Sequence, residues 1–402
     1  MNDTIKPYYG EFFVSVIPLE MGGNFCSHNC GYCFANLNNR ERRLDVAGTM
    51  RLIENRRERL SLEGQLLKLG YPVLISNKVD PFSRSNYRDM LPVMELLIKE
   101  GISIAIQTRG GLGIEETLKF LPPSVWYVSI THDQDETREV IEPTAPSIES
   151  RFDLIRTLKR HGHRVVVGVN PLNPDWIREP ESFFNRLRDV GAEGVWFEFL
   201  HLSYKQRDNL GPRERKALGE DLIKLSMKRN PPGKWQDFGS LCEGLAEAVG
   251  LEIFQIGQGR RSDFWRPFKE TYERTFPNLQ DWVNHCHDHA IESFGIRDWL
   301  GFFGDKLPSE VDSSQLYHYV EFGAQREQTG IIIPKVRRYR DLLPECWKSK
   351  KFPRANPIKA SNFLYLGRES KDGSVEPILE DGLPRFGFVP GGTDFEYWIV
   401  EG

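Results

Sequence analysis

The sequence predicts an α/β fold, a partial (β/α)6 TIM barrel followed by a C-terminal α+β extension. Three observations predict it. Apolar segments with strand character alternate with helical segments up to about residue 200. A cysteine-rich loop follows the first apolar segment, where a barrel strand would present a ligand group. Past about residue 210 the alternation stops, so we expect a core over residues 1–210 and an extension over residues 211–402.

The alternation places the strands and helices of the core in order. The predicted strands are residues 12–17, 71–76, 103–107, 126–130, 164–169 and 194–200. The predicted helices between them are residues 49–69, 87–100, 114–120, 148–161 and 180–190. Parallel strands need long crossovers of this kind, whereas antiparallel strands can be joined by tight turns. A doubly wound open sheet has the same periodicity and is the alternative architecture.

The extension has a different pattern, helical at first and β-rich at the end. Helices are predicted over residues 212–229, 238–249 and 280–294, with a strand at 251–256. Apolar and aromatic runs at 361–366 and 395–400, set among Gly and Pro, predict a small β-rich cap that could take part in substrate binding.

Composition limits the class of protein. With 402 residues and 39% hydrophobic content, the chain can bury a substantial core. Its net charge of -4 excludes a global polycation, so any nucleic-acid site must be a local patch. We expect a cytoplasmic protein that does not enter a membrane, because the first residues lack an apolar core and no stretch approaches 18 uncharged apolar residues.

Three cysteines in eight residues form the strongest motif. Cys26, Cys30 and Cys33 have the spacing Cys-x3-Cys-x2-Cys. They supply three ligands where a closed zinc site or an ordinary 4Fe-4S cluster has four, so one iron of a bound cluster would stay open. The alternatives are a zinc loop completed by His28 or a distant cysteine, and three unrelated buried thiols. The other cysteines are widely spaced, which excludes a disulfide framework and suits a reducing compartment.

Polar residues follow the second, third and fourth predicted strands, at residues 76–82, 107–111 and 129–133. A barrel would bring these strand ends together around a ligand. The alternative is that they only cap helices and turns, which polar residues at strand ends often do.

The cysteine spacing, with Tyr32 directly before the last cysteine, resembles the radical S-adenosylmethionine (SAM) superfamily. The stretches Glu142-Pro143-Thr144-Ala145-Pro146-Ser147 and Gly168-Val169-Asn170-Pro171-Leu172-Asn173-Pro174 are similar to its spore photoproduct lyase branch. The resemblance covers roughly residues 10 to 205. It implies a 4Fe-4S cluster held by Cys26, Cys30 and Cys33, and a reductant such as flavodoxin or ferredoxin.

The resemblance also implies how SAM is bound and used. The open iron takes the amino and carboxylate groups of SAM, and an electron from the cluster cleaves SAM to a 5'-deoxyadenosyl radical that abstracts hydrogen. By matching position, Tyr32 would lie against the adenine, Arg109 would meet the SAM carboxylate and Ser129 the ribose. A guanidinium suits a carboxylate because it can donate two parallel bonds. Three further residues are implied for the aminoacyl and adenosine groups of SAM: Ser76, Asn77 and Asn170.

One departure from that branch bears on the reaction. Spore photoproduct lyases carry a hydrogen-donor cysteine near the end of the second strand, and this sequence has no cysteine between Cys33 and Cys242. Its absence favours an isomerisation, in which the product radical recovers hydrogen from 5'-deoxyadenosine, or the use of another donor. By analogy we expect a nucleic-acid base as substrate, for instance a thymine carrying an amino-acid group, as in phage DNA hypermodification in the host cytoplasm.

Residues 335–359 carry nine Lys and Arg against two acidic residues, with three aromatic residues interleaved. This composition predicts contact with DNA or a nucleotide through phosphates and stacked bases, the alternative being a solvated loop. His285 and His289 share one helical face and could hold a second metal, although Trp282 and Val283 favour a packed amphipathic helix.

Two other functions remain open at this point. A radical SAM enzyme could act on a peptide or small metabolite, in which case the basic segment would not matter. A non-catalytic metal-binding module that recognises nucleic acid would bind no SAM.

Overall fold

The computed structural model describes residues 5–7, 16–38, 44–75, 78–228, 232–254, 264–277, 279–311, 363–388 and 397–399. The chain divides into two compact units. The first holds Met1–Lys6, Glu20–Asn55 and Pro72–Phe254, and the second holds Pro7–Leu19, Arg56–Tyr71 and Gln255–Gly402. Within the described residues no helix is long and apolar enough to cross a membrane.

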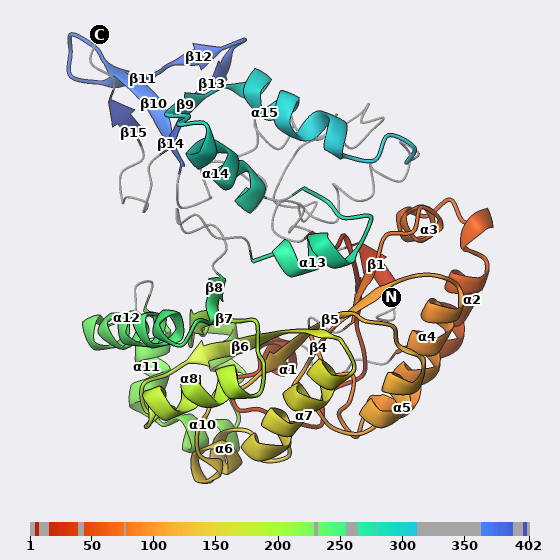
Figure 1. Cartoon of the computed structure of the whole chain (residues 1–402). Coiled ribbons are helices and arrows are strands. Elements are labelled where there is room, and N and C mark those ends of the chain that lie inside the picture. The colour runs from red at the N-terminus through yellow and green to blue at the C-terminus, as the bar shows by residue number, and fades with distance from the viewer. Residues whose placement is uncertain are drawn as a thin grey trace. The chain divides into compact units, whose positions relative to one another are not determined.

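One sheet of eight strands, in the order β1 to β8, forms the centre of the first unit (Figure 1). Each pair from β3 to β8 is parallel. The strands are β1 (Ile5–Pro7), β2 (Leu19–Met21), β3 (Val73–Ile75), β4 (Ile104–Thr108), β5 (Val125–Ser129), β6 (Arg164–Leu172), β7 (Gly194–Phe199) and β8 (Glu252–Phe254).

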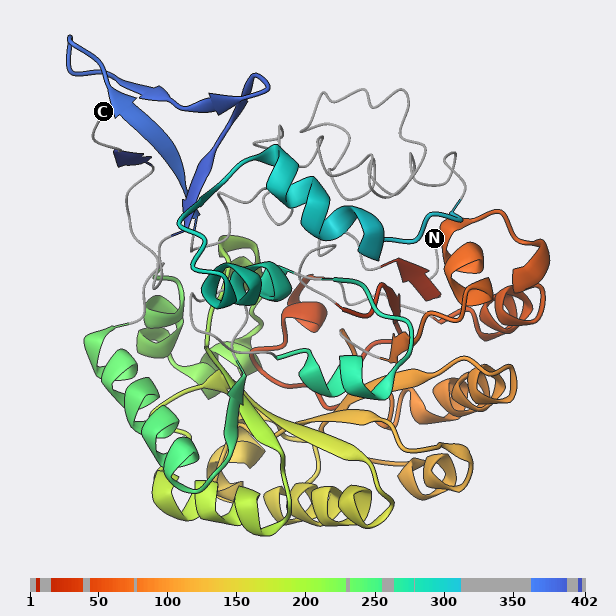
Figure 2. The ribbon, with the colours of Figure 1, turned by 45° about the horizontal axis from the view of Figure 1, so that its top comes forward.

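Helices connect the strands, and the segment Arg56–Tyr71 between two of the strands belongs to the second unit. The helices of this part of the chain are α1 (Phe34–Asn38), α2 (Val46–Glu54), η1 (Arg56–Glu58), α3 (Leu62–Lys68), α4 (Tyr87–Lys99), α5 (Ile114–Phe120), α6 (Asp135–Ile141), α7 (Ile148–Arg160), α8 (Pro180–Asp189), α9 (Tyr204–Asp208), α10 (Pro212–Leu218), α11 (Glu220–Ser226) and α12 (Gly233–Ala248). In Figure 2 the helices α4, α5, α7 and α8 form an arc outside the strands. This arrangement is the predicted partial barrel.

The two faces of the sheet differ in polarity. Val128, Val167 and Val195 are in register on neighbouring strands, and each is fully buried. This apolar face packs on the helices, as the contact of the Phe184 ring of α8 with Phe197 shows. Because side chains alternate along a strand, the next residues point to the opposite face. That second face carries the polar residues described below.

The α/β class and the C-terminal extension are confirmed. Of the first predicted strand, residues 12–15 lie outside the described residues and residues 16–17 form a bend, and the described strand before the cysteine loop is β2. The sheet also continues past residue 210 into β8, and the domain boundary there stays a prediction.

Three helices predicted as continuous are interrupted. The helix over 49–69 is divided into α2 and α3, because the Ser61 hydroxyl accepts a bond from the Gly64 N–H and starts a new helix. The helix over 212–229 breaks at Gly219, whose φ of 76° lies in the left-handed region. The helix over 280–294 ends at Asp288, and residues 293–294 form a strand instead.

The second unit contains a small antiparallel sheet with the order β11-β10-β14-β9 and a parallel fifth strand, β15, beside β10. Its strands are β9 (Ser293–Phe294), β10 (Phe363–Glu369), β11 (Val375–Pro377), β14 (Phe386–Phe388) and β15 (Tyr397–Ile399), with a separate hairpin of β12 (Leu379–Glu380) and β13 (Leu383–Pro384). Its helices are α13 (Arg266–Thr271), α14 (Leu279–Asp288), α15 (Ile296–Phe303) and η2 (Gly304–Lys306). Trp282, Trp299 and Phe294 form an aromatic core there.

Candidate functional site

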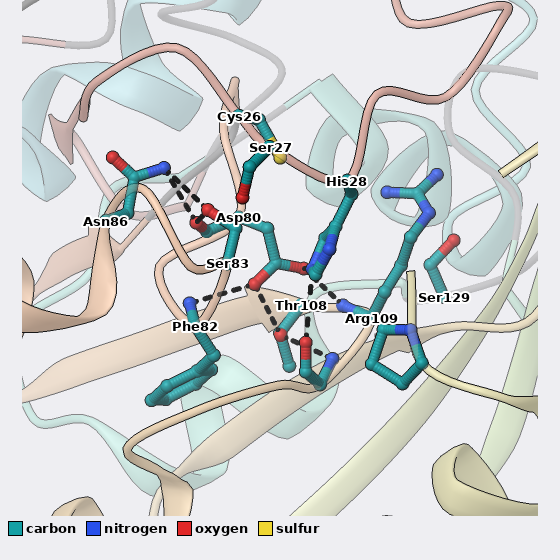
Figure 3. Close-up of polar contacts among 12 residues, drawn as sticks. Cys26, Ser27, His28, Asp80, Phe82, Ser83, Asn86, Thr108, Arg109 and Ser129 are labelled. Carbon is teal, nitrogen blue, oxygen red and sulfur yellow. Dashed lines mark hydrogen bonds and ion pairs between the residues drawn. The ribbon is translucent and has the colours of Figure 1, made fainter. Parts of the chain in front are cut away.

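Residues at the carboxyl ends of β4, β5 and β6 share the polar face of the sheet. Ser129 is in register with Gly168, and Asn170 lies two residues further on, so both point to this face. Arg109 directly follows β4, two residues after Gln107, which is in register with Tyr127 of the same face. Figure 3 shows the Arg109 and Ser129 side chains pointing to the same side. The fold therefore brings the ends of these three strands to one edge.

The cysteine loop begins after β2 and leads into α1. Cys26 and Cys30 are buried and Cys33 is half-buried. Burial, with smaller effects of Asp80 and Cys33, raises the pKa of Cys26 to about 12. Burial also raises the pKa of Cys30 well above its usual value, with Cys33 and Cys26 contributing. Cys33 is therefore near enough to both of these thiols to affect their ionisation.

No three His, Cys, Asp or Glu side chains in the described part of the chain are arranged as they stand to hold a metal ion. The donor set nevertheless fits an iron-sulfur cluster, because it consists of three neighbouring thiols on one loop. The raised pKa values of Cys26 and Cys30 mean that these two thiols are protonated without a metal, and metal binding would displace their protons.

A buried carboxylate, Asp80, connects this loop to the strand ends (Figure 3). One oxygen, Oδ1, accepts bonds from the Thr108 hydroxyl and the Phe82 N–H, each at 2.9 Å. The other, Oδ2, accepts the Arg109 N–H at 2.6 Å and lies 3.4 Å from Nε2 of His28. Asp80 thus joins the residues after β3, the end of β4 and the cysteine loop.

His28 lies between Cys26 and Cys30, but both of its ring nitrogens contact protein oxygens. Nδ1 is 3.3 Å from the Thr144 carbonyl and Nε2 is 3.2 Å from the Gly110 carbonyl. A zinc site completed by His28 would have to break these contacts. The structure thus favours a role for His28 in fixing the loop.

A second buried carboxylate, Glu142, organises the other side of the loop. Its Oε1 accepts bonds from the Tyr32 hydroxyl, from Nε of Arg109 at 3.2 Å and from the Thr131 hydroxyl at 3.0 Å. Its Oε2 accepts Nη2 of Arg151 at 2.5 Å, and both of these side chains are fully buried. Burial alone would raise the pKa of Glu142, but Arg151 and Arg109 outweigh it and hold the pKa well below its usual range.

This network leaves Arg109 able to bind an anion. Nη2 of Arg109 donates to the Tyr32 hydroxyl at 2.9 Å, and no described residue bonds Nη1. The side chain is 22% exposed. Two guanidinium groups, those of Arg109 and Arg151, share the single carboxylate of Glu142.

The predicted SAM residues are placed as follows. Tyr32 and Arg109 are in direct contact, and Tyr32 also packs against Trp176 with ring centroids 5.5 Å apart. The carbonyl of Ser129 accepts a bond from Arg151. Asn170 is bonded to Glu198 and to none of the others. Ser76 and Asn77 lie outside the described residues. The SAM contacts of all these residues stay predictions.

Two other predicted sites are less informative. The basic segment 335–359 lies outside the described residues. The rings of His285 and His289 have centroids 4.2 Å apart on and just after α14, and in the described chain no three-residue metal group includes them. The neighbouring Trp282 and Val283 are buried, as expected for a packed amphipathic helix.

Sequence reasoning missed the roles of Asp80, Glu142 and Glu198. Asp80 and Glu142 stand in polar stretches that the sequence did single out, but nothing in those stretches identifies their partners. Glu198 could have been found from strand alternation, since it is a charged residue two positions after Trp196 near the end of a predicted strand.

Comparison with known proteins agrees with this geometry. Residues 22–186, which include the cysteine loop and Arg109, Ser129 and Asn170, match the Radical SAM superfamily. The chain contains a radical SAM domain. The superfamily resemblance is thereby confirmed. A superfamily of this kind implies SAM and a 4Fe-4S cluster as cofactors.

Two curated viral proteins are similar to the chain. The uncharacterized protein ORF301 of Acidianus two-tailed virus is 28% identical over 141 residues, 33% of this chain and 47% of that protein. The radical SAM Nalpha-GlyT isomerase of Pseudomonas phage M6 is 25% identical over 220 residues, 53% of this chain and 45% of that protein. The chain therefore spans just under half the length of the curated relatives it matches.

Among solved structures, the chain is similar to a spore photoproduct lyase complexed with dinucleoside spore photoproduct. The TM-score is 0.42 at 13% identity, and the match covers 57% of this chain and 73% of that one. Similarity at this level says nothing about the substrate.

Proposed function

We propose that the protein is a radical SAM enzyme that abstracts hydrogen from a nucleic-acid base and isomerises a thymine carrying an amino-acid group. The observation that carries the proposal is the position of the three-cysteine loop. Asp80 and Glu142 hold this loop against the strand ends that carry Arg109 and Ser129. A radical SAM enzyme needs its cluster ligands and its SAM-binding residues at this one edge.

Cys26, Cys30 and Cys33 would hold the 4Fe-4S cluster. When bound, the cluster supplies the electron that cleaves SAM to a 5'-deoxyadenosyl radical. Arg109 would bind the SAM carboxylate, because Nη1 has no partner among the described residues and its guanidinium shares the Glu142 carboxylate with Arg151. Glu142 fixes the direction of the Arg109 guanidinium, and Ser129 presents its hydroxyl beside it (Figure 3).

Three observations support the substrate. The phage M6 relative is named as an Nalpha-GlyT isomerase. No cysteine lies between Cys33 and Cys242 to act as a hydrogen donor, which favours an isomerisation over a repair reaction. Residues 335–359 carry the basic and aromatic composition that suits phosphates and bases.

The test is SAM cleavage by the full chain, purified without oxygen and reconstituted with iron and sulfide. With dithionite, the wild type should form 5'-deoxyadenosine and Cys30→Ala should form none. Cys242→Ala is the matched control, since this buried thiol lies on α12, outside the cysteine loop, and the variant should behave as the wild type does. A wild type with a complete cluster that forms no 5'-deoxyadenosine, even with DNA present, would contradict the proposal.

The substrate is tested separately with DNA containing deuterated thymine or amino-acid-modified thymine. Deuterium should appear in 5'-deoxyadenosine, and the triple variant R337A/R338A/R340A should lower the transfer. Transfer from a peptide and from neither DNA would point to the other substrate class. Transfer from DNA that the triple variant leaves unchanged would contradict the role of the basic segment.

A further inference from the structure

Glu198 is a carboxylate on the polar face of the sheet to which neither the cysteine loop nor the comparisons assign a role. Trp196 is in register with Gly168, so Glu198, two residues later on β7, lies beside Asn170 on β6. The Asn170 amide donates to Oε2 of Glu198 at 3.1 Å. Asn170 is one of the residues expected to bind the adenosine of SAM, so Glu198 borders that part of the site.

The carboxylate is exposed and has no cationic partner among the described residues. The Glu198 side chain is exposed, yet the protein atoms around it raise the pKa of its carboxyl above the usual value, which the Asn170 bond and His201 only partly oppose. Among the described residues no lysine or arginine forms an ion pair with it. A carboxylate in such surroundings gains most from a cationic hydrogen-bond donor.

Two aromatic rings lie on the same face of the sheet as Glu198. The Tyr127 ring packs directly on Gly168, where a Cβ would lie 2.6 Å from it. The rings of Tyr127 and Trp196 have centroids 5.5 Å apart on the same face as Glu198. Aromatic faces of this kind attract organic cations.

We propose that Glu198 binds a protonated amine on the substrate, and that Asn170 orients its carboxylate. The inference rests on the proposed function, because the amine would be that of the amino-acid group on the modified thymine. SAM also carries an amine, so the test must distinguish the two sources.

The test is calorimetric binding to the full, cluster-reconstituted chain without reductant. The probes are 5-aminomethyl-2'-deoxyuridine, which carries an amine on the thymine methyl carbon, and thymidine, which does not. The wild type should prefer the amine probe, and Glu198→Gln should weaken binding of that probe about tenfold or more while changing thymidine binding little. Glu181→Gln, an exposed carboxylate on α8, is the matched control and should keep the preference.

Several results would overturn the inference. The inference fails if the wild type binds both probes equally well, or if Glu198→Gln still prefers the amine probe. It also fails if Glu198→Gln weakens the binding of both probes equally. If Glu198→Gln weakened the binding of SAM and not that of the amine probe, the carboxylate would be assigned to the amine of SAM. Binding needs no reductant, so this outcome is separate from that of the proposed function, which fails if no 5'-deoxyadenosine forms.

Discussion

Replacing Glu142 with Gln should strongly destabilise the protein. Both oxygens of this carboxylate are engaged, and the Glu142 and Arg151 side chains are 0% exposed with 2.5 Å between Oε2 and Nη2. The variant keeps the shape but leaves the Arg151 charge buried beside a neutral amide. Breaking one side of a buried ion pair costs about 3–5 kcal/mol, so the free energy of unfolding should fall by about that amount.

The matched control is an exposed ion pair of the same length. Nη2 of Arg186 lies 2.5 Å from Oε2 of Glu149, but their side chains are 37% and 58% exposed. Glu149→Gln should therefore lower the free energy of unfolding by less than about 1 kcal/mol. Urea titrations of both variants measure the difference, and equal losses would refute the argument that burial decides the effect.

A double variant separates the ion pair from the packing. In Glu142→Gln/Arg151→Met no charge of this pair is left unmatched, so the double variant should be more stable than Glu142→Gln alone. The pH dependence gives an independent check. The pKa of folded Glu142 is below the ordinary value of 4.5, so its stabilisation is present above pH 4.5 and is lost as the pH falls below it. The difference in the free energy of unfolding between the wild type and Glu142→Gln should therefore become smaller below pH 4.5.

Two further predictions concern packing and protonation. Gly168→Ala should lower the free energy of unfolding by about 1–3 kcal/mol, because the new Cβ would meet the Tyr127 ring. Gly244→Ala in α12 is the control: a Cβ there has nothing within 4 Å, so the variant should be neutral or more stable by up to about 1 kcal/mol. Equal urea midpoints for the two variants would contradict this prediction. Burial and His161 lower the pKa of His163 to about 4. Below pH 6.5 the unfolded chain therefore binds more protons at this residue than the folded chain does, so the free energy of unfolding should fall as the pH drops from 6.5 to about 4. His163→Gln should lose less stability over that interval in urea titrations, and an equal loss would refute the assignment.

The type and position of several core elements were predictable from local patterns. The predicted segments for α5 and α8 and for β4, β5 and β7 agree with the structure to within about two residues, since apolar periodicity over a whole element is a strong signal. The predictions failed where a helix ends and another begins within one apolar pattern. Ser61 and Gly219 interrupt helices whose apolar periodicity continues past them, so the pattern alone did not reveal the ends.

The sequence by itself predicted the radical SAM superfamily, because three cysteines within eight residues are a local feature that needs no knowledge of the fold. Only the tertiary structure decided which distant groups act with them. Asp80 is 52 residues from His28, and Glu142 is 110 residues from Tyr32. Strand register brought Glu198 next to Asn170 in the same way. Pairings of this kind depend on how strands align and which faces they share, and no spacing along the chain encodes them.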